Sequence, residues 1–334
     1  MNKCALCLNK EANKTNTHYL TDALLRSNFA VNGICKREKG TYYDVSSDTS
    51  SMSFGFQRGT SPEVIKERLG REPNEKEIEA AKYNPYSADY VFCSDCEKLF
   101  CEIEEPFTEK ILPKLTMGKL TDNFIELNES RIIRLFFILQ FWRSHVCNTD
   151  IKLGEEISEC FRKIILGYKN CNDFDLKQYP MSLTYIKTEE DNNHSAHFSG
   201  VASGKNPYVI FLNDFIVQLY DSNDDVKFEE LFGINEKDSY KDFINFNESL
   251  FKIKIINESE WKEIETNYFL TIKKPKIIEV FLRVFLCTLH YCPSQYDVND
   301  FLIYFEKHNH LCSFSEEYLI DESKSYIAEK FNAR

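Results

Sequence analysis

The stretch YVFCSDCEKLF, residues 90–100, places two cysteines where a short apolar run meets a helical pattern. A second pair with the same spacing lies near the N-terminus, in CALC at residues 4–7. Two such pairs supply four thiolates, which satisfy the tetrahedral coordination of Zn²⁺. An amphipathic helix that directly follows a cysteine pair also stabilises thiolate charge at its N-terminus. We therefore expect four cysteines to bind a structural zinc ion: Cys4, Cys7, Cys93 and Cys96.

A second interpretation treats these four residues as ordinary buried thiols. The chain has 12 cysteines, so some pairs arise by chance, and 85 residues separate the two pairs. A disulfide framework is not expected, because the segment at the N-terminus lacks the apolar core of a signal peptide and a reducing cytoplasmic location follows. The strand-to-helix context of residues 90–100 favours the metal over the buried thiols.

Composition limits the classes of protein to which the chain can belong. Its 334 residues suffice for about two domains, and aromatic residues at 14% of the chain can build a packed core. No run of 18 apolar residues occurs, so neither a transmembrane helix nor a membrane partner is expected. The net charge of -12 argues against a surface that binds nucleic acid throughout, although residues 1–71 carry a balance of +4.

The pattern of elements predicts an α+β fold with two domains. The first, residues 1–118, is expected to be a zinc-bound domain with a lobe inserted at about 30–88. The second, residues 119–334, is expected to be mostly helical with some strands. Strands are predicted over 41–56, 181–187 and 206–221, and helices over 93–115, 130–146, 154–168, 279–291, 296–308 and 315–331. The dipeptide Asn213-Asp214 predicts a hairpin turn within 206–221.

Three short stretches resemble the HNH endonuclease family, in particular its divergent bacterial members: CALC at 4–7, NTHYL at 16–20 and CSDCEKLF at 93–100. The resemblance covers residues 1–115 at most. It implies a treble-clef-like zinc scaffold with the ββα-metal fold and a nuclease site that uses one catalytic metal ion. The family's activity is cleavage of phosphodiester bonds, and by analogy the chain is expected to be an anti-phage effector of bacterial defence.

The resemblance also implies roles for individual residues. His18 occupies the position of the general base, and a histidine ordinarily titrates near neutral pH, which suits that role. The catalytic cation is expected to be Mg²⁺ or Mn²⁺, held by oxygen ligands. Thr17 stands where the family often has a metal-binding aspartate. Glu97 is therefore our first choice of carboxylate, and Asn16 could orient the imidazole or contact the phosphate.

Each of these roles has a structural alternative. His18 can make a structural hydrogen bond, and the glutamates after residue 96 can form a solvated helix face. Nucleic acid is the expected partner, with DNA favoured over RNA, and the C-terminal domain is expected to bind a protein partner. Five basic residues are candidates for phosphate contacts: Arg26, Lys36, Arg37, Lys39 and Arg58. The alternative function is a non-catalytic, zinc-stabilised subunit that binds a protein or nucleic-acid partner.

Overall fold

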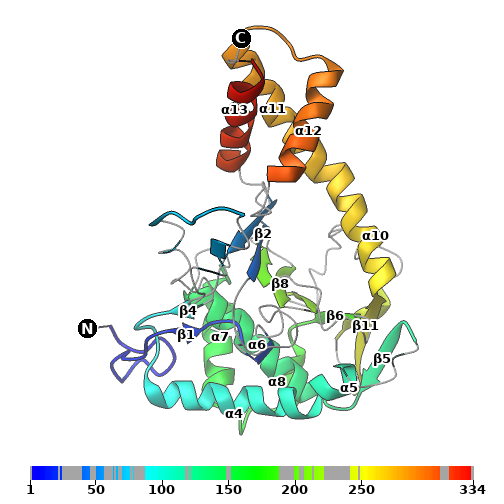
Figure 1. Ribbon diagram of the computed structural model, residues 1–334. Coiled ribbons are helices and arrows are strands. Elements are labelled where there is room, and N and C mark those ends of the chain that lie inside the picture. The colour runs from blue at the N-terminus through cyan, green and yellow to red at the C-terminus, as the bar shows by residue number, and fades with distance from the viewer. Residues whose placement is uncertain are drawn as a thin grey trace.

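One of the two longest apolar stretches of the sequence forms helix α6, Ser130–Cys147, which is buried over most of its length. In the computed structural model this helix lies between helix α4 and the strands of a large sheet (Figure 1). The structure describes residues 2–21, 23–24, 40–45, 50–55, 63, 65–66, 70–75, 78, 87–116, 120, 122–147, 152–187, 199–202, 207–212, 214–221, 241–246, 249–308 and 316–331.

Within these residues, nine strands form one mixed sheet. The order is β3-β2-β7-β8-β9-β6-β11-β5, and β10 pairs with β6. The β2–β7 and β6–β11 pairs are parallel, and the other pairs are antiparallel. The strands are β2 Gly40–Val45, β3 Ser50–Gly55, β5 Phe124–Leu127, β6 Met181–Lys187, β7 Ser199–Ala202, β8 Tyr208–Leu212, β9 Phe215–Leu219, β10 Ile244–Asn245 and β11 Phe251–Asn257.

The hairpin predicted from residues 206–221 is confirmed. Strands β8 and β9 pair antiparallel, with Leu212 opposite Phe215, so two residues join them. All five residues of each strand are buried, which explains their nearly continuous apolar sequence, since neither face of these strands meets water. Strand β6, predicted over 181–187, is also confirmed.

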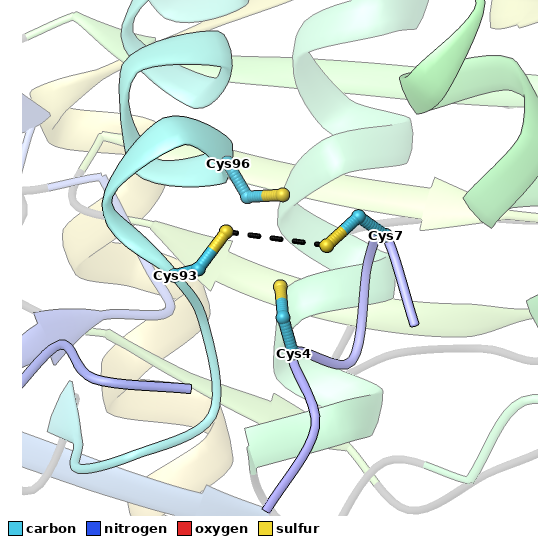
Figure 2. A group of neighbouring side chains, drawn as sticks. All are labelled: Cys4, Cys7, Cys93 and Cys96. Carbon is cyan, nitrogen blue, oxygen red and sulfur yellow. Dashed lines mark hydrogen bonds between the residues drawn. The ribbon is translucent and has the colours of Figure 1, made fainter. Parts of the chain in front are cut away.

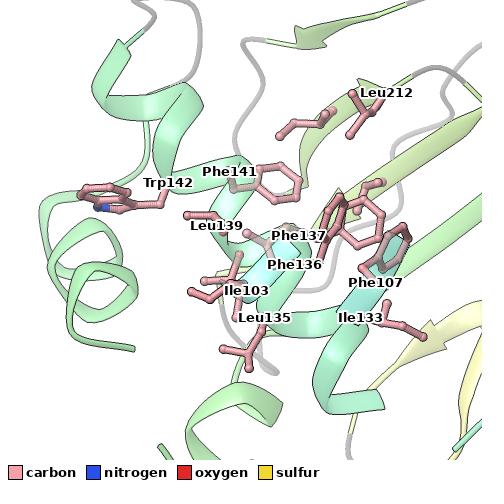
Figure 3. Close-up of a cluster of buried hydrophobic side chains, with 14 of the residues drawn as sticks. Ile103, Phe107, Ile133, Leu135, Phe136, Phe137, Leu139, Phe141, Trp142 and Leu212 are labelled. Atoms are coloured by element: carbon pink, nitrogen blue, oxygen red, sulfur yellow. The ribbon is translucent and has the colours of Figure 1, made fainter. Parts of the chain in front are cut away.

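Helix α4 carries the second cysteine pair into the core. It runs from Ser94 to Lys110 and continues through Pro106. The other helices of this region are α5 Leu112–Thr116, α7 Glu155–Leu166 and α8 Asp173–Lys177. The Phe107 ring stacks on Phe136 of α6, with centroids 4.0 Å apart, and meets Phe215 of β9 edge-on at 5.9 Å (Figure 3). One aromatic side chain therefore joins α4, α6 and the sheet.

The predicted α+β class is confirmed, with a mixed sheet. The domain boundary predicted between residues 118 and 119 stays a prediction. Residues from both sides of it, from Cys4 to Ile255, contribute to one hydrophobic core. In addition, β2, from the segment expected to be an inserted lobe, pairs with β7 of the C-terminal part.

Three helices near the C-terminus have a separate core. They are α11 Lys274–Leu289, α12 Gln295–His308 and α13 Glu316–Phe331, and they confirm the three predicted closing helices. Phe281 of α11 stacks on Phe301 of α12 with centroids 4.1 Å apart, and Tyr326 of α13 contacts both rings. Helix α10, Glu258–Tyr268, and a π-helical segment, Phe269–Lys273, lead to α11. The three helices project away from the large sheet (Figure 1).

No helix in the described part of the chain has both the length and the apolar character that spanning a bilayer requires.

The position of Phe107 predicts the effect of its removal. Phe107→Ala should lower the free energy of unfolding by about 3–5 kcal/mol, because it empties a site between three elements. Phe269→Ala is the matched control, since Phe269 is 41% exposed, and it should cost less than about 1 kcal/mol. Urea unfolding followed by tryptophan fluorescence measures both. Equal losses in the two variants would contradict the central place of Phe107 in the core.

Candidate metal centre

The first cysteine pair lies in a tight backbone turn. The Leu8 N–H donates to the Cys4 carbonyl over 2.9 Å, and the Cys4 N–H donates to the Lys10 carbonyl over 2.8 Å. Leu8 takes a left-handed conformation, with φ 60°, which reverses the chain directly after Cys7. The Ala5 N–H donates to the Val91 carbonyl over 2.9 Å. This last bond draws the turn against the segment that precedes the second pair.

The second pair opens helix α4. Cys93 is the N-cap residue of this helix, and Cys96 lies in its first turn. The Asn13 and Lys14 N–H groups both donate to the Phe92 carbonyl over 3.1 Å. Strand β1, Thr17–His18, pairs antiparallel with β4, Ser87–Ala88. The two cysteine pairs are therefore connected by a short antiparallel ladder.

Together these contacts bring four sulfur atoms to one point (Figure 2). The Sγ atoms of Cys4, Cys7, Cys93 and Cys96 all lie within 4.8 Å of one another. Those of Cys7 and Cys93 are 4.0 Å apart. A tetrahedral zinc site with Zn–S bonds of about 2.3 Å separates its sulfurs by about 3.8 Å. All four cysteines are free rather than disulfide-bonded, so this group can hold a metal ion such as zinc.

The surroundings shift the pKa values of the thiols in different directions. Burial raises the pKa of Cys4, and it also raises the pKa of Cys96, to which the neighbouring Cys93 and Cys4 add. Burial acts in the same direction on Cys7, but hydrogen bonds from the backbone of Lys10 and Asn9 and from the side chains of Cys4 and Cys96 together outweigh it and lower the pKa of Cys7 to about 7. Buried thiols that lack a cation stay protonated, whereas a bound divalent ion deprotonates its thiol ligands.

The residues predicted to be catalytic lie close to the cluster in sequence but do not join it. His18 is half-buried on β1, opposite Ser87. Asn16 is exposed and left-handed, with φ 55°, and its backbone N–H donates to Asp89 Oδ1 over 2.6 Å. Its contact is therefore made by the backbone rather than by the amide side chain.

Glu97 directly follows Cys96 in α4 and is half-buried. Its Oε1 atom is fully buried and has no hydrogen-bond partner among the described residues. Among those residues the four cysteines are the one group of His, Cys, Asp or Glu side chains close enough to share a metal ion. Catalytic roles for His18, Glu97 and Asn16 therefore stay predictions.

Five basic residues were predicted to contact phosphate groups, and all of them lie outside the described residues: Arg26, Lys36, Arg37, Lys39 and Arg58.

A buried polar network was missed from the sequence. The Thr21 N–H donates to Gln140 Oε1 over 2.9 Å, and Gln140 Nε2 donates back to Thr21 Oγ1 over 2.7 Å. Arg143 pairs with Glu104, and their side chains are 4% and 17% exposed. Thr21 Oγ1 and Gln140 Nε2 also donate to Glu104 Oε1. The signal in the sequence was the pair Gln140 and Arg143, three residues apart and flanked by apolar residues of α6.

This network fixes the chain three residues beyond His18. It links Thr21 to α4 through Glu104 and to α6 through Gln140. The Arg143 guanidinium also lies over the Phe100 ring, 5.3 Å from its centroid. His18 is thus located between two anchored points, the cysteine cluster on one side and the Thr21 network on the other.

The cysteine cluster predicts the metal content of the purified chain. Wild-type protein should contain one zinc ion per chain, and Cys93→Ser should lose most of it, because serine is a poor zinc ligand. Cys287→Ser is the control, since Cys287 is exposed on α11 and belongs to no such group within the described part of the chain. Elemental analysis by mass spectrometry measures all three. Full zinc content in Cys93→Ser would contradict this metal centre.

The polar network predicts an unusual pattern of stabilities. Arg143→Met should lower the free energy of unfolding by about 3 kcal/mol, because Glu104 loses its buried partner. The double variant Arg143→Met, Glu104→Met should be more stable than the single one, since it leaves no unpaired charge. Arg283→Met is the control: it breaks an ion pair with Glu316 whose side chains are 47% and 48% exposed, and should cost less than about 1 kcal/mol. Urea unfolding decides between this pattern and simple additivity.

Comparison of the chain with protein-family models, with curated proteins and with solved structures found no match. The function of the chain must therefore be inferred from the geometry of its own residues.

Proposed function

We propose that this chain is a metal-dependent nuclease of the HNH type, in which the four cysteines hold a structural zinc ion. The observation that carries the proposal is the convergence of the four sulfurs around the β1–β4 pair and the start of α4. A cysteine turn, an antiparallel strand pair and a second cysteine turn that opens a helix are the parts of a treble-clef scaffold. The ββα-metal fold carries its nuclease site on the same parts.

His18 is the proposed general base. It lies on the strand between the two cysteine pairs and is not one of the four residues that converge there. An imidazole can accept a proton from water near neutral pH and so generate the attacking nucleophile. The cluster and the Thr21 network hold the backbone on both sides of His18. A base held in this way needs little reorganisation during the reaction.

Glu97 is the proposed carboxylate ligand of a catalytic Mg²⁺ or Mn²⁺. A buried carboxylate oxygen without a hydrogen-bond donor is unfavourable, and Glu97 Oε1 is such an atom. A divalent cation with oxygen ligands compensates this charge. When bound, the cation would neutralise charge on the phosphate and on the leaving oxygen.

The substrate and the setting belong to the same proposal. Nucleic acid, with DNA favoured over RNA, is the expected substrate, and the basic balance of residues 1–71 supports contact with phosphates near this end. Service as an anti-phage effector in the bacterial cytoplasm is proposed from the resemblance to the HNH family.

A second candidate is a non-catalytic, zinc-stabilised subunit that binds a partner. Two observations favour it. Thr17, at the position where the family often has aspartate, is 4% exposed, and its Oγ1 has no hydrogen-bond partner among the described residues. The helices near the C-terminus expose large apolar side chains, which are typical of protein-binding surfaces: Leu282, Leu286, Tyr296 and Ile303.

A nicking assay separates the two functions. Wild-type chain with Mg²⁺ or Mn²⁺ should nick plasmid DNA, and His18→Ala, with its zinc content unchanged, should cut at least about 100-fold more slowly because the general base is lost. His308→Ala is the control, since His308 stacks on Tyr304 in α12, and its rate should stay within about twofold.

Glu97→Gln should raise the metal concentration needed for half-maximal cleavage. Full activity in His18→Ala would remove the imidazole from the mechanism. Failure of the wild-type chain to cut either DNA or RNA would contradict the nuclease and favour the binding subunit.

A further inference from the structure

Arg162 of helix α7 reaches the backbone of the first cysteine pair. Its Nη1 donates to the Leu6 carbonyl over 2.8 Å. Leu6 is fully buried and lies within the Cys4–Cys7 turn. Residue 162 is separated from this turn by more than 150 positions and belongs to the part of the chain beyond residue 118, so the contact is not imposed by neighbouring sequence.

Glu159 fixes the direction of the Arg162 guanidinium. Arg162 Nε donates to Glu159 Oε2 over 2.7 Å, and Nη2 donates to Oε1 over 2.8 Å. A two-bond pair of this kind locks the planar group and leaves its remaining N–H groups in a defined direction. The Arg162 side chain is 16% exposed. The guanidinium is therefore held in place before it contacts the cysteine turn.

The charge of Arg162 also suits the cluster. Four thiolates around one divalent ion carry a net charge of about −2, so cations nearby are favourable. The pKa of Arg162 is raised, first by its hydrogen bonds to Glu159 and in part by the charge of Cys7. Lys10 is a second cation near the cluster. Its pKa is raised mainly by Asp95, and the charges of Cys93 and Cys7 contribute. Groups beyond the ligands that contribute charge and hydrogen bonds tune metal sites strongly.

We propose that Arg162 is a positioning residue of the metal centre: it holds the Cys4–Cys7 turn in its metal-binding conformation and couples that turn to α7. The inference rests on the structural zinc of the proposed function and is independent of nuclease activity.

The chain that follows α7 makes a second link, to α4. The Tyr168 hydroxyl donates to Glu102, and Lys169 pairs with the same carboxylate over 2.8 Å. The cysteine turn, α7 and α4 are therefore linked in a ring: Arg162 joins the turn to α7, the chain after α7 joins α4, and a bound metal ion would join α4 to the turn. Release of the metal would free the turn and so weaken the link that Arg162 makes between α7 and the turn.

The rate of zinc release tests the inference on the full-length chain loaded with zinc. With excess chromogenic chelator, Arg162→Met should release zinc about 10- to 100-fold faster than wild type, the usual range for residues that support metal ligands. Arg162→Lys keeps the charge without the fork, and its rate should fall between the two. Lys163→Met is the matched control, because Lys163 also pairs with Glu159, at 3.6 Å, but its side chain is 70% exposed. Its release rate should match wild type.

Hydrogen exchange supplies a second measurement. Chelation of the metal should accelerate amide exchange in α7 of wild type, and in Arg162→Met the exchange of α7 should be fast with or without metal. If Arg162→Met does not fold, Glu159→Gln weakens the same fork and should also speed release. If Arg162→Met releases zinc at the wild-type rate, or if Lys163→Met accelerates release as much as Arg162→Met does, the proposed role of Arg162 is overturned. The structural zinc is not affected by either result. A wild-type chain that binds no zinc overturns the structural zinc together with the role of Arg162, whatever the nicking assay shows.

Discussion

The meeting of four sulfur atoms within 4.8 Å is the constraint on which the N-terminal part of this molecule depends. Four thiolates cannot share so small a volume without a cation, and four neutral thiols would contribute little beyond ordinary packing. A metal ion that closes a loop of this length removes much conformational freedom from the unfolded chain. Residues 2–14 contain no regular helix or longer strand. The turn around Cys4 therefore has little regular structure of its own, and a metal cross-link would stabilise it.

Helix α4 connects the cysteine cluster to the rest of the molecule. Its first turn carries Cys96, its middle carries Glu104 of the buried network, and its last turns carry Phe107 of the aromatic core. These three positions lie at the cysteine cluster, at the Thr21 network and against the large sheet, in that order. A displacement at the cysteines therefore reaches the core through one continuous helix, which behaves as a rigid element. The helix predicted over 93–115 is confirmed in part: α4 continues through Pro106 to Lys110, and a separate helix, α5, begins at Leu112.

Local patterns predicted what local forces decide. The spacing within each cysteine pair identified the two halves of the cluster, and the Asn213-Asp214 dipeptide identified the hairpin, because each of these signals depends on residues close together in sequence. Strand β11 was missed although Lys252 and Lys254 alternate with its buried residues, a period of two that is typical of a half-buried strand. The parallel pairing of β2 with β7 could not be predicted, since nothing in either segment specifies a partner some 150 residues away. The contact of Arg162 with the cysteine turn could not be predicted for a similar reason. In the sequence, Arg162 and Glu159 have the spacing of an ordinary surface ion pair.

The buried pair of Arg143 and Glu104 bears on whether the scaffold serves a site. Burying two charges is expensive, and well-packed apolar residues in their place are often at least as stable. Such a pair is better explained by the geometry it imposes than by the stability it adds. What it fixes here is Thr21, and through Thr21 the end of the strand that carries His18. A structural histidine on a two-residue strand would need no such support, because the β1–β4 pairing and the cysteine turn already hold its backbone. An imidazole that must keep one orientation toward a substrate does need it, since the rate of proton transfer depends steeply on distance and direction. The polar network thus holds Thr21, three residues beyond His18, in the position that the catalytic role proposed for His18 would require.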